Sequence, residues 1–223
     1  MDEDKPECRL AYVKPTVENV VAYNRYKKTQ PMVNGVSMVS VPCLDMPILF
    51  GGGRDFDLLL LQHPHNVLAG VDLFILSNAI LLWFDHLGCG IEAPYSSVIY
   101  HGSVHSPADR EGRQLSMLVT LDRDPLLNDQ FPPTPNDPGS DSLELLLRPR
   151  YSLYDRHYNP EIDTLFNFQD FGVNRGDQMV NNCHEAIATC LEIYNTQDPP
   201  PDLEQDEQEL LPETIFAEQG TIG

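Results

Sequence analysis

The chain is patterned mainly as short runs in which apolar and polar residues alternate, the period of a strand with one buried face. The clearest run is 114–121, where Leu115, Met117, Val119 and Leu121 share one side. Residues that favour turns separate the runs. The pattern predicts seven short strands in the segments 57–61, 71–76, 79–84, 90–93, 97–104, 114–121 and 143–148, preceded by shorter apolar runs at 36–41 and 47–50.

Two neighbouring strands are predicted to form a hairpin, because Ser77 and Asn78 supply a turn between segments 71–76 and 79–84. Trp83 lies in this hairpin among apolar neighbours, so we expect it in the core. The three glycines at 51–53 carry no side chains and are predicted to interrupt the regular structure between two strands.

The apolar period changes to three and four between Asp177 and Tyr194, which predicts an amphipathic helix over 177–194. Asn174 is a candidate N-cap, and the prolines from Pro199 onward end the helix. The stripe that we expect to face the core consists of Met179, Val180, Cys183, Ile187, Cys190, Leu191 and Tyr194.

These elements predict a mainly β fold with one C-terminal helix, arranged as a small seven-stranded antiparallel barrel that the helix caps. Residues 1–31 are interpreted as an N-terminal arm, 32–196 as the barrel with its capping helix, and 197–223 as a disordered acidic tail. Within the barrel, residues 122–142 hold five prolines and five aspartates, which predicts a long acidic loop between two strands.

Charge is distributed unevenly along the 223 residues, whose net charge is −20. The first 28 residues hold six basic and five acidic residues, and no lysine follows Lys28. Such a surface repels nucleic acid and anionic membranes and attracts basic partners, so we expect no direct contact with nucleic acid. Solubility alone accounts for the charge equally well.

No segment is predicted to cross or enter a membrane. The longest apolar run, 80–84, is far shorter than the roughly 20 residues that span a bilayer, and the charged N-terminus does not resemble a signal peptide. A cytoplasmic and nuclear protein is expected.

The sequence contains no motif that indicates catalysis, a metal or a cofactor. Its five cysteines form no C-x-x-C pair, and neither G-x-S-x-G nor H-E-x-x-H occurs. His101 and His105 are spaced for ligation on a helix, but they lie in a predicted strand. The glycines at 51–53 precede no Lys-Ser or Lys-Thr, so a phosphate loop is not indicated. We therefore expect no enzyme, although an unrecognised hydrolase stays an alternative.

Three segments resemble the ICln family. Residues 72–84 are similar to its strand, polar turn and second strand with tryptophan, and residues 88–101 to its next strand, its bend with proline and tyrosine, and a strand that ends in histidine. Residues 159–177 resemble the fungal branch, typified by a yeast protein induced at low temperature. The chain departs from the family in its longer N-terminal region and its short acidic tail.

The resemblance implies a pleckstrin-homology-like barrel without enzymatic activity. It also implies a chaperone or adaptor for Sm proteins in the assembly of small nuclear ribonucleoproteins, working with an arginine methyltransferase complex. In that role an exposed edge strand pairs with an Sm strand, and acidic segments occupy the place of RNA. The alternative is a pleckstrin-homology-like module that binds lipid or a membrane surface, or a regulator of volume or chloride conductance.

The strand from Ser97 to Val104 is our candidate for the partner-binding edge, and the acidic loop for an electrostatic helper. The candidate edge residues are Ser97, Val98, Ile99, Tyr100, His101 and Val104, and the candidate acidic residues are Asp122, Asp124, Asp129, Asp137 and Asp141. Basic proteins other than Sm proteins are open as partners.

Overall fold

A computed structural model describes residues 6–29, 32–33, 36–37, 46–105, 115–133, 141–149 and 176–197 of the chain. In chain order its elements are β1 (Arg9–Ala11), β2 (Val21–Ala22), α1 (Tyr23–Thr29), β3 (Met32–Val33), β4 (Val36–Ser37), β5 (Ile48–Leu60), β6 (His63–Leu76), β7 (Ala79–Phe84), β8 (Cys89–Pro94), the 3-10 turn η1 (Tyr95–Ser97), β9 (Val98–His105), β10 (Leu115–Asp122), α2 (Pro125–Gln130), β11 (Ser142–Pro149) and α3 (Asp177–Gln197).

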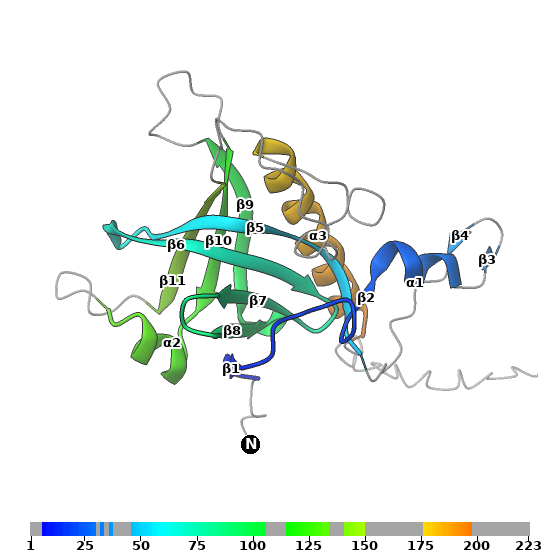
Figure 1. Ribbon diagram of the computed structural model, residues 1–223, viewed down its shortest axis with the longest axis horizontal. Coiled ribbons are helices and arrows are strands. Elements are labelled where there is room, and N and C mark those ends of the chain that lie inside the picture. Colours follow the sequence, from blue (N-terminus) through cyan, green and yellow to red (C-terminus); the bar gives the residue numbers. More distant parts are fainter. Residues whose placement is uncertain are drawn as a thin grey trace, which may run out of the picture.

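One strongly curved sheet forms most of the fold, and α3 lies along it (Figure 1). Its strands follow the order β1-β8-β7-β6-β5-β11-β10-β9, and every neighbouring pair is antiparallel. Strand β2 adds a short parallel pair to β5. The predicted fold class is confirmed, since seven strands from β5 to β11 and a C-terminal helix make up the body. Among the described strands the sheet does not close, because β1 and β9 stand at its two ends.

The predicted N-terminal arm contributes strands to this sheet. Arg9–Ala11 pairs with β8, and Val21–Ala22 pairs with β5. Cys8 and Val20 are buried in two apolar clusters of the core. The chain before residue 30 thus covers part of the sheet that the central segment forms.

Strand β5 runs without interruption through the three glycines at 51–53, so the predicted break there is wrong. An added Cβ at Gly51 would lie 2.8 Å from the Cβ of Ala186 in α3, closer than such atoms approach in proteins. Close packing of α3 explains Gly51 and Gly53, where an added Cβ would meet Ala186 and Met179, and a φ of 147° explains Gly52. The pairing of β5 with β6 shows register shifts, which let so long a strand bend.

The apolar stripe of α3 faces the core as predicted. Met179, Val180, Cys183, Ile187 and Cys190 are buried, and Leu191 and Tyr194 pack against the same cluster. The helix begins at Asp177, whose carboxylate accepts a hydrogen bond from the Leu115 N–H of β10 at 2.8 Å. This contact ties the start of the helix to the sheet. The candidate N-cap Asn174 lies outside the described residues.

The segment 122–142 is less irregular than predicted. Helix α2 occupies Pro125–Gln130 within it, with Asp124 as N-cap and a proline in its first turn. The Asp124 carboxylate accepts from the Leu127 N–H at 2.8 Å, and Leu127 is fully buried. The prediction of an acidic loop is thus wrong at α2. The composition of the segment is typical of a loop, but Asp124 caps a short helix in it and Leu127 of that helix is buried.

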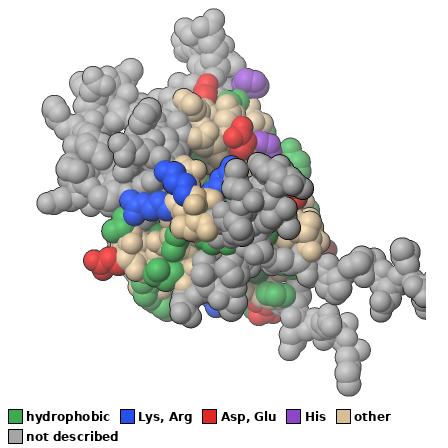
Figure 2. Space-filling view, turned by 90° about the vertical axis from the view of Figure 1, so that its right-hand side faces the viewer, with side chains coloured by type: hydrophobic (Ala, Val, Ile, Leu, Met, Phe, Trp, Pro, Cys, Tyr) green, Lys and Arg blue, Asp and Glu red, His purple; other side chains and the backbone are tan. Residues whose placement is uncertain are grey.

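Helix α1 lies to one side of the sheet and is attached through aromatic side chains. Tyr23 stacks on Phe50 of β5 with ring centroids 4.5 Å apart, and Tyr26 is buried. Lys27 and Lys28 are exposed in the last turn, where positive charge suits the helix dipole. From the α1 side of the molecule, Figure 2 shows basic side chains grouped near the centre of the face and acidic ones around them.

Candidate functional site

The predicted contact strand stands at one end of the sheet. Strand β9 pairs with β10 on one side, and no other strand of the described segments pairs with it. Ile99 and Tyr100 expose 59% and 54% of their surface, a large fraction for apolar side chains in a strand. Val98, His101 and Val104 are partly buried, and Ser97 is buried in η1, just before the strand. The edge therefore combines open backbone with exposed apolar side chains.

Ile99 forms an irregularity in this strand. Val98 pairs with Leu121 and Tyr100 pairs with Thr120, so Ile99 has no residue of β10 opposite it. Such a bulge increases the local twist and re-aims a side chain. From Tyr100 to His105 the register with β10 is regular. That regular stretch is the part of the edge that a further strand can extend.

The opposite end of the sheet is a poorer candidate. Strand β1 has three residues, Arg9–Ala11, against eight in β9. Its Arg9 forms an ion pair with Glu92 of the neighbouring strand β8. Short length and charge are the devices by which proteins blunt an edge.

Two histidines join the edge strand to α3. The Nδ1 atoms of His101 and His184 lie 3.0 Å apart, a hydrogen bond in which one ring donates and the other accepts. Burial, and next the neighbouring His184, lowers the pKa of His101 below its ordinary value of 6.5. The bond is lost when both rings are protonated, because each Nδ1 then carries a hydrogen.

Acidification is expected to weaken the attachment of α3. A His101 pKa below 6.5 means that the folded state binds fewer protons than the unfolded state, so stability is present at neutral pH and lost as the pH falls below about 6.5. We expect the melting temperature of the wild type to fall between pH 7.5 and 5, and that of His184→Gln to fall by a few degrees less over the same range. Equal falls in the variant and the wild type would contradict the prediction.

The predicted acidic residues do not act as one group. Asp122 pairs with Ser142 in the sheet, and Asp124 accepts hydrogen bonds from α2 and, at 2.6 Å, from the Cys8 N–H. Asp129 and Asp141 are exposed, and Asp137 lies outside the described residues. Asp124 is thus committed to the fold, and its expected role as a free electrostatic helper is not supported.

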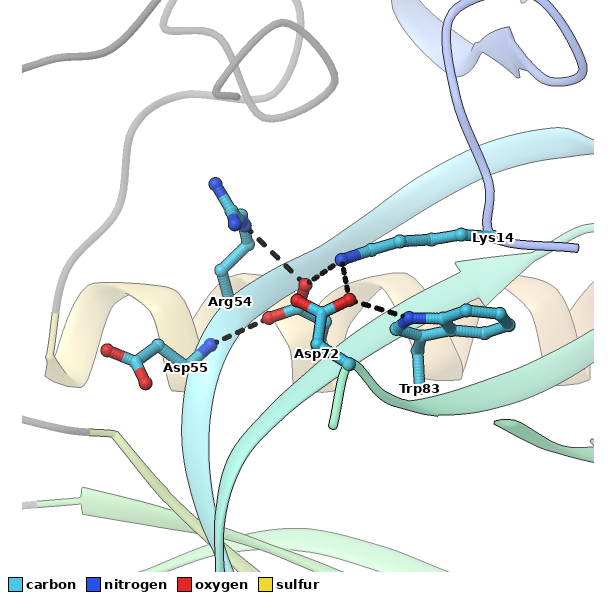
Figure 3. Close-up of polar contacts among 6 residues, drawn as sticks. Lys14, Arg54, Asp55, Asp72 and Trp83 are labelled. Atoms are coloured by element: carbon cyan, nitrogen blue, oxygen red, sulfur yellow. Dashed lines mark hydrogen bonds and ion pairs between the residues drawn. The ribbon is translucent and has the colours of Figure 1, made fainter. Parts of the chain in front are cut away.

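Sequence reasoning missed a buried ionic cluster that joins the N-terminal segment to the hairpin (Figure 3). Asp72 is 3% exposed, and its Oδ2 lies 2.7 Å from Lys14 Nζ and 3.5 Å from Arg54 Nε. Its Oδ1 accepts from the Asp55 N–H at 2.9 Å. Lys14 also contacts Asp85, which accepts from Trp83 Nε1 at 2.7 Å. Because each charge has a partner, the cluster is structural.

No set of three potential metal ligands occurs in the described parts of the chain. The ring of His101 contacts the ring of His184 in α3. Burial raises the pKa of Cys183 and Cys190 to about 12 and that of Cys8 still further, so these thiols are poor nucleophiles. None of the described helices is long and apolar enough to cross a bilayer.

Comparison with known proteins identifies the family. Residues 71–221 match the family described as regulators of volume decrease after cellular swelling, and the chain belongs to it. The chain is similar to Protein LOT5 of Saccharomyces cerevisiae, with 43% identity over 99% of this chain and 78% of that protein. Protein LOT5 of Vanderwaltozyma polyspora is 49% identical over 87% and 70%. The predicted membership of the ICln-like family is thereby confirmed.

The chain has a distant similarity to one chain of the solved structure "The 8S snRNP Assembly Intermediate". The two share 14% sequence identity and a TM-score of 0.46 over 89% of this chain and 98% of that chain. The family description is that of a regulator and names no enzymatic reaction.

Proposed function

We propose that this protein is a non-catalytic chaperone or adaptor that holds a basic β-protein, with Sm proteins as the first candidates. The observation that carries the proposal is β9, an eight-residue strand at the end of the sheet with Ile99 and Tyr100 exposed. A partner strand added there gains backbone hydrogen bonds from the open edge and apolar contact from these two side chains.

Charge supports a basic partner. The net charge of −20 draws cationic proteins and repels nucleic acid. Strand β10 pairs Leu121 with Val98, so the acidic segment that begins at Asp122 lies beside the start of β9. A basic segment that follows a partner strand past this end would meet the exposed carboxylates of that segment.

The resemblance to the ICln family supports a particular class of partner. The resemblance to ICln implies Sm proteins before they close on small nuclear RNA, and this role would place the protein in both cytoplasm and nucleus. An arginine methyltransferase complex is a second partner that the same resemblance suggests.

Charge placed on the edge strand is expected to abolish partner binding. Lysines at both exposed positions, Ile99→Lys with Tyr100→Lys, remove apolar contact and present a cation to a cationic partner. We expect recovery of Sm proteins from a eukaryotic extract, read by mass spectrometry at about 50 mM salt, to fall roughly tenfold. For the unchanged protein, recovery should weaken at about 300 mM salt.

Tyr12→Lys with Leu87→Lys is the matched control, because it adds the same charge at exposed aromatic and aliphatic side chains that lie outside the strands. Equal recovery by the edge variant and the control would overturn the role of β9. Absence of Sm proteins with the wild-type bait would remove them as partners. Binding to anionic vesicles in a parallel sedimentation assay would instead favour the membrane-surface alternative.

A further inference from the structure

A small cavity of about 280 Å³ opens between α1, β5 and α3, on a different part of the molecule from the edge of β9. Tyr23 and Phe50 form an aromatic wall, and Gly51 and Gly52 leave a wall of bare backbone. Asn182 and Glu185 of α3 line the side facing them. The volume is at the small end for ligand sites and suits one side chain rather than a larger molecule.

Two polar side chains that line the cavity, Asn182 and Glu185, offer oxygen atoms that can accept hydrogen bonds. No described residue bonds or pairs with the Glu185 carboxylate or with the side-chain amide of Asn182, while the Thr189 hydroxyl is used by the helix backbone at 2.9 Å. Glu185 is the one charged residue among those that line the cavity. An anionic ligand would face this carboxylate unpaired, so the cavity favours a cation.

The aromatic wall narrows the class of cation. Tyr23 and Phe50 stack on each other with an angle of 23° between their planes, and both residues line the cavity together with Glu185. A guanidinium is planar, stacks on aromatic rings and donates to a carboxylate and an amide oxygen at once, whereas an ammonium is compact and strongly hydrated. Lys27 and Lys28 are exposed and do not line the cavity.

We propose that the cavity bounded by Tyr23, Phe50 and Glu185 is a binding site for an arginine side chain of a partner protein. The guanidinium stacks against the aromatic wall and donates hydrogen bonds to Glu185 and Asn182. The acidic surface attracts basic proteins in general, whereas this site recognises one basic residue at a specific position.

The test is a titration of the full-length protein with N-acetyl-arginine amide, followed by ¹H–¹⁵N NMR. N-acetyl-citrulline amide is the neutral control with the same shape, and N-acetyl-lysine amide tests the need for a planar cation. We expect shifts in the amides of residues 23–24, 50–52 and 182–189, with millimolar affinity, and arginine bound roughly threefold to fivefold more tightly than citrulline, the range of an exposed ion pair.

Glu185→Gln should remove the preference for arginine over citrulline, and Tyr23→Leu should weaken both ligands. Glu192→Gln changes an exposed carboxylate on the same helix that does not line the cavity, so it should keep the preference. Equal affinity for arginine and citrulline in the wild type, or shifts confined to other residues, would overturn the site. Equal affinity for lysine would overturn its assignment to a guanidinium. The edge variants of β9 leave the cavity intact, so the two proposals fail separately.

Discussion

Replacement of Asp72 by alanine is expected to lower the free energy of unfolding by about 3 kcal/mol, the low end of the cost of removing one partner of a buried charge pair. Asp72 is almost fully buried and accepts from Lys14, Arg54 and the Asp55 N–H. The two cations are partly exposed and regain water when the carboxylate is lost, which keeps the cost below the upper end of that range.

The backbone at Asp55 adds to this cost. Asp55 has a φ of 62°, in the left-handed region that non-glycine residues rarely adopt, and the hydrogen bond from its N–H to Asp72 helps to hold it there. Chemical denaturation followed by Trp83 fluorescence measures the change, because Trp83 donates to a carboxylate of the same cluster.

Asp85→Ala is the comparison for Asp72→Ala. Asp85 shares Lys14 but its side chain is more than half exposed, so its removal is expected to cost about 1 kcal/mol, mainly because the Trp83 Nε1–H loses its acceptor. Similar losses in the two variants would show that burial of Asp72 does not set the cost, and would contradict the prediction.

Gly51→Ala is expected to destabilise the protein by about 2 kcal/mol, within the range for overpacking a core. The added Cβ meets Ala186 Cβ at 2.8 Å, and neither atom can rotate away because both are fixed to backbone. The strand and α3 must therefore move apart, which loosens the buried stripe of the helix.

A double-mutant cycle isolates this contact. Ala186→Gly alone costs helix propensity, about 1 kcal/mol, and leaves the strand unchanged. In the Gly51→Ala background the same substitution removes the clash, so we expect the two changes to couple by at least about 1 kcal/mol in the stabilising direction. Additive losses in urea unfolding would show that the clash is relieved in another way.

Local patterns were sufficient for much of the fold. The hairpin of β6 and β7 follows alternation and a two-residue turn, and the stripe of α3 follows its helical period, so each could be predicted from neighbouring residues. The path of β5 could not. The glycines at 51–53 continue the strand, and Gly51 lies against Ala186 of α3, a contact between residues more than a hundred positions apart that local patterns do not show.

The candidate site, like the fold, could be predicted from the sequence only in part. The β character of 97–104 was visible in its branched residues, and its place at the end of the sheet agrees with the expected edge. The ionic cluster was not visible, because Lys14, Arg54 and Asp72 meet only through tertiary structure. The role of Asp124 was not predicted, because an aspartate in a segment rich in proline and aspartate is typical of a loop. The same aspartate directly before Pro125 is also the N-cap signal of α2.

The bulge at Ile99 limits the length of β9 with which a partner strand can pair, and so affects how long a complex on this edge lasts. Among the described residues, a partner strand can continue the regular ladder along 100–105, a length of about 20 Å in which alternate residues direct backbone groups outward. So few hydrogen bonds give a short residence time, since affinity among related complexes is set mainly by the rate of dissociation. If β9 pairs with a partner strand as we propose, so short a ladder favours release of that partner.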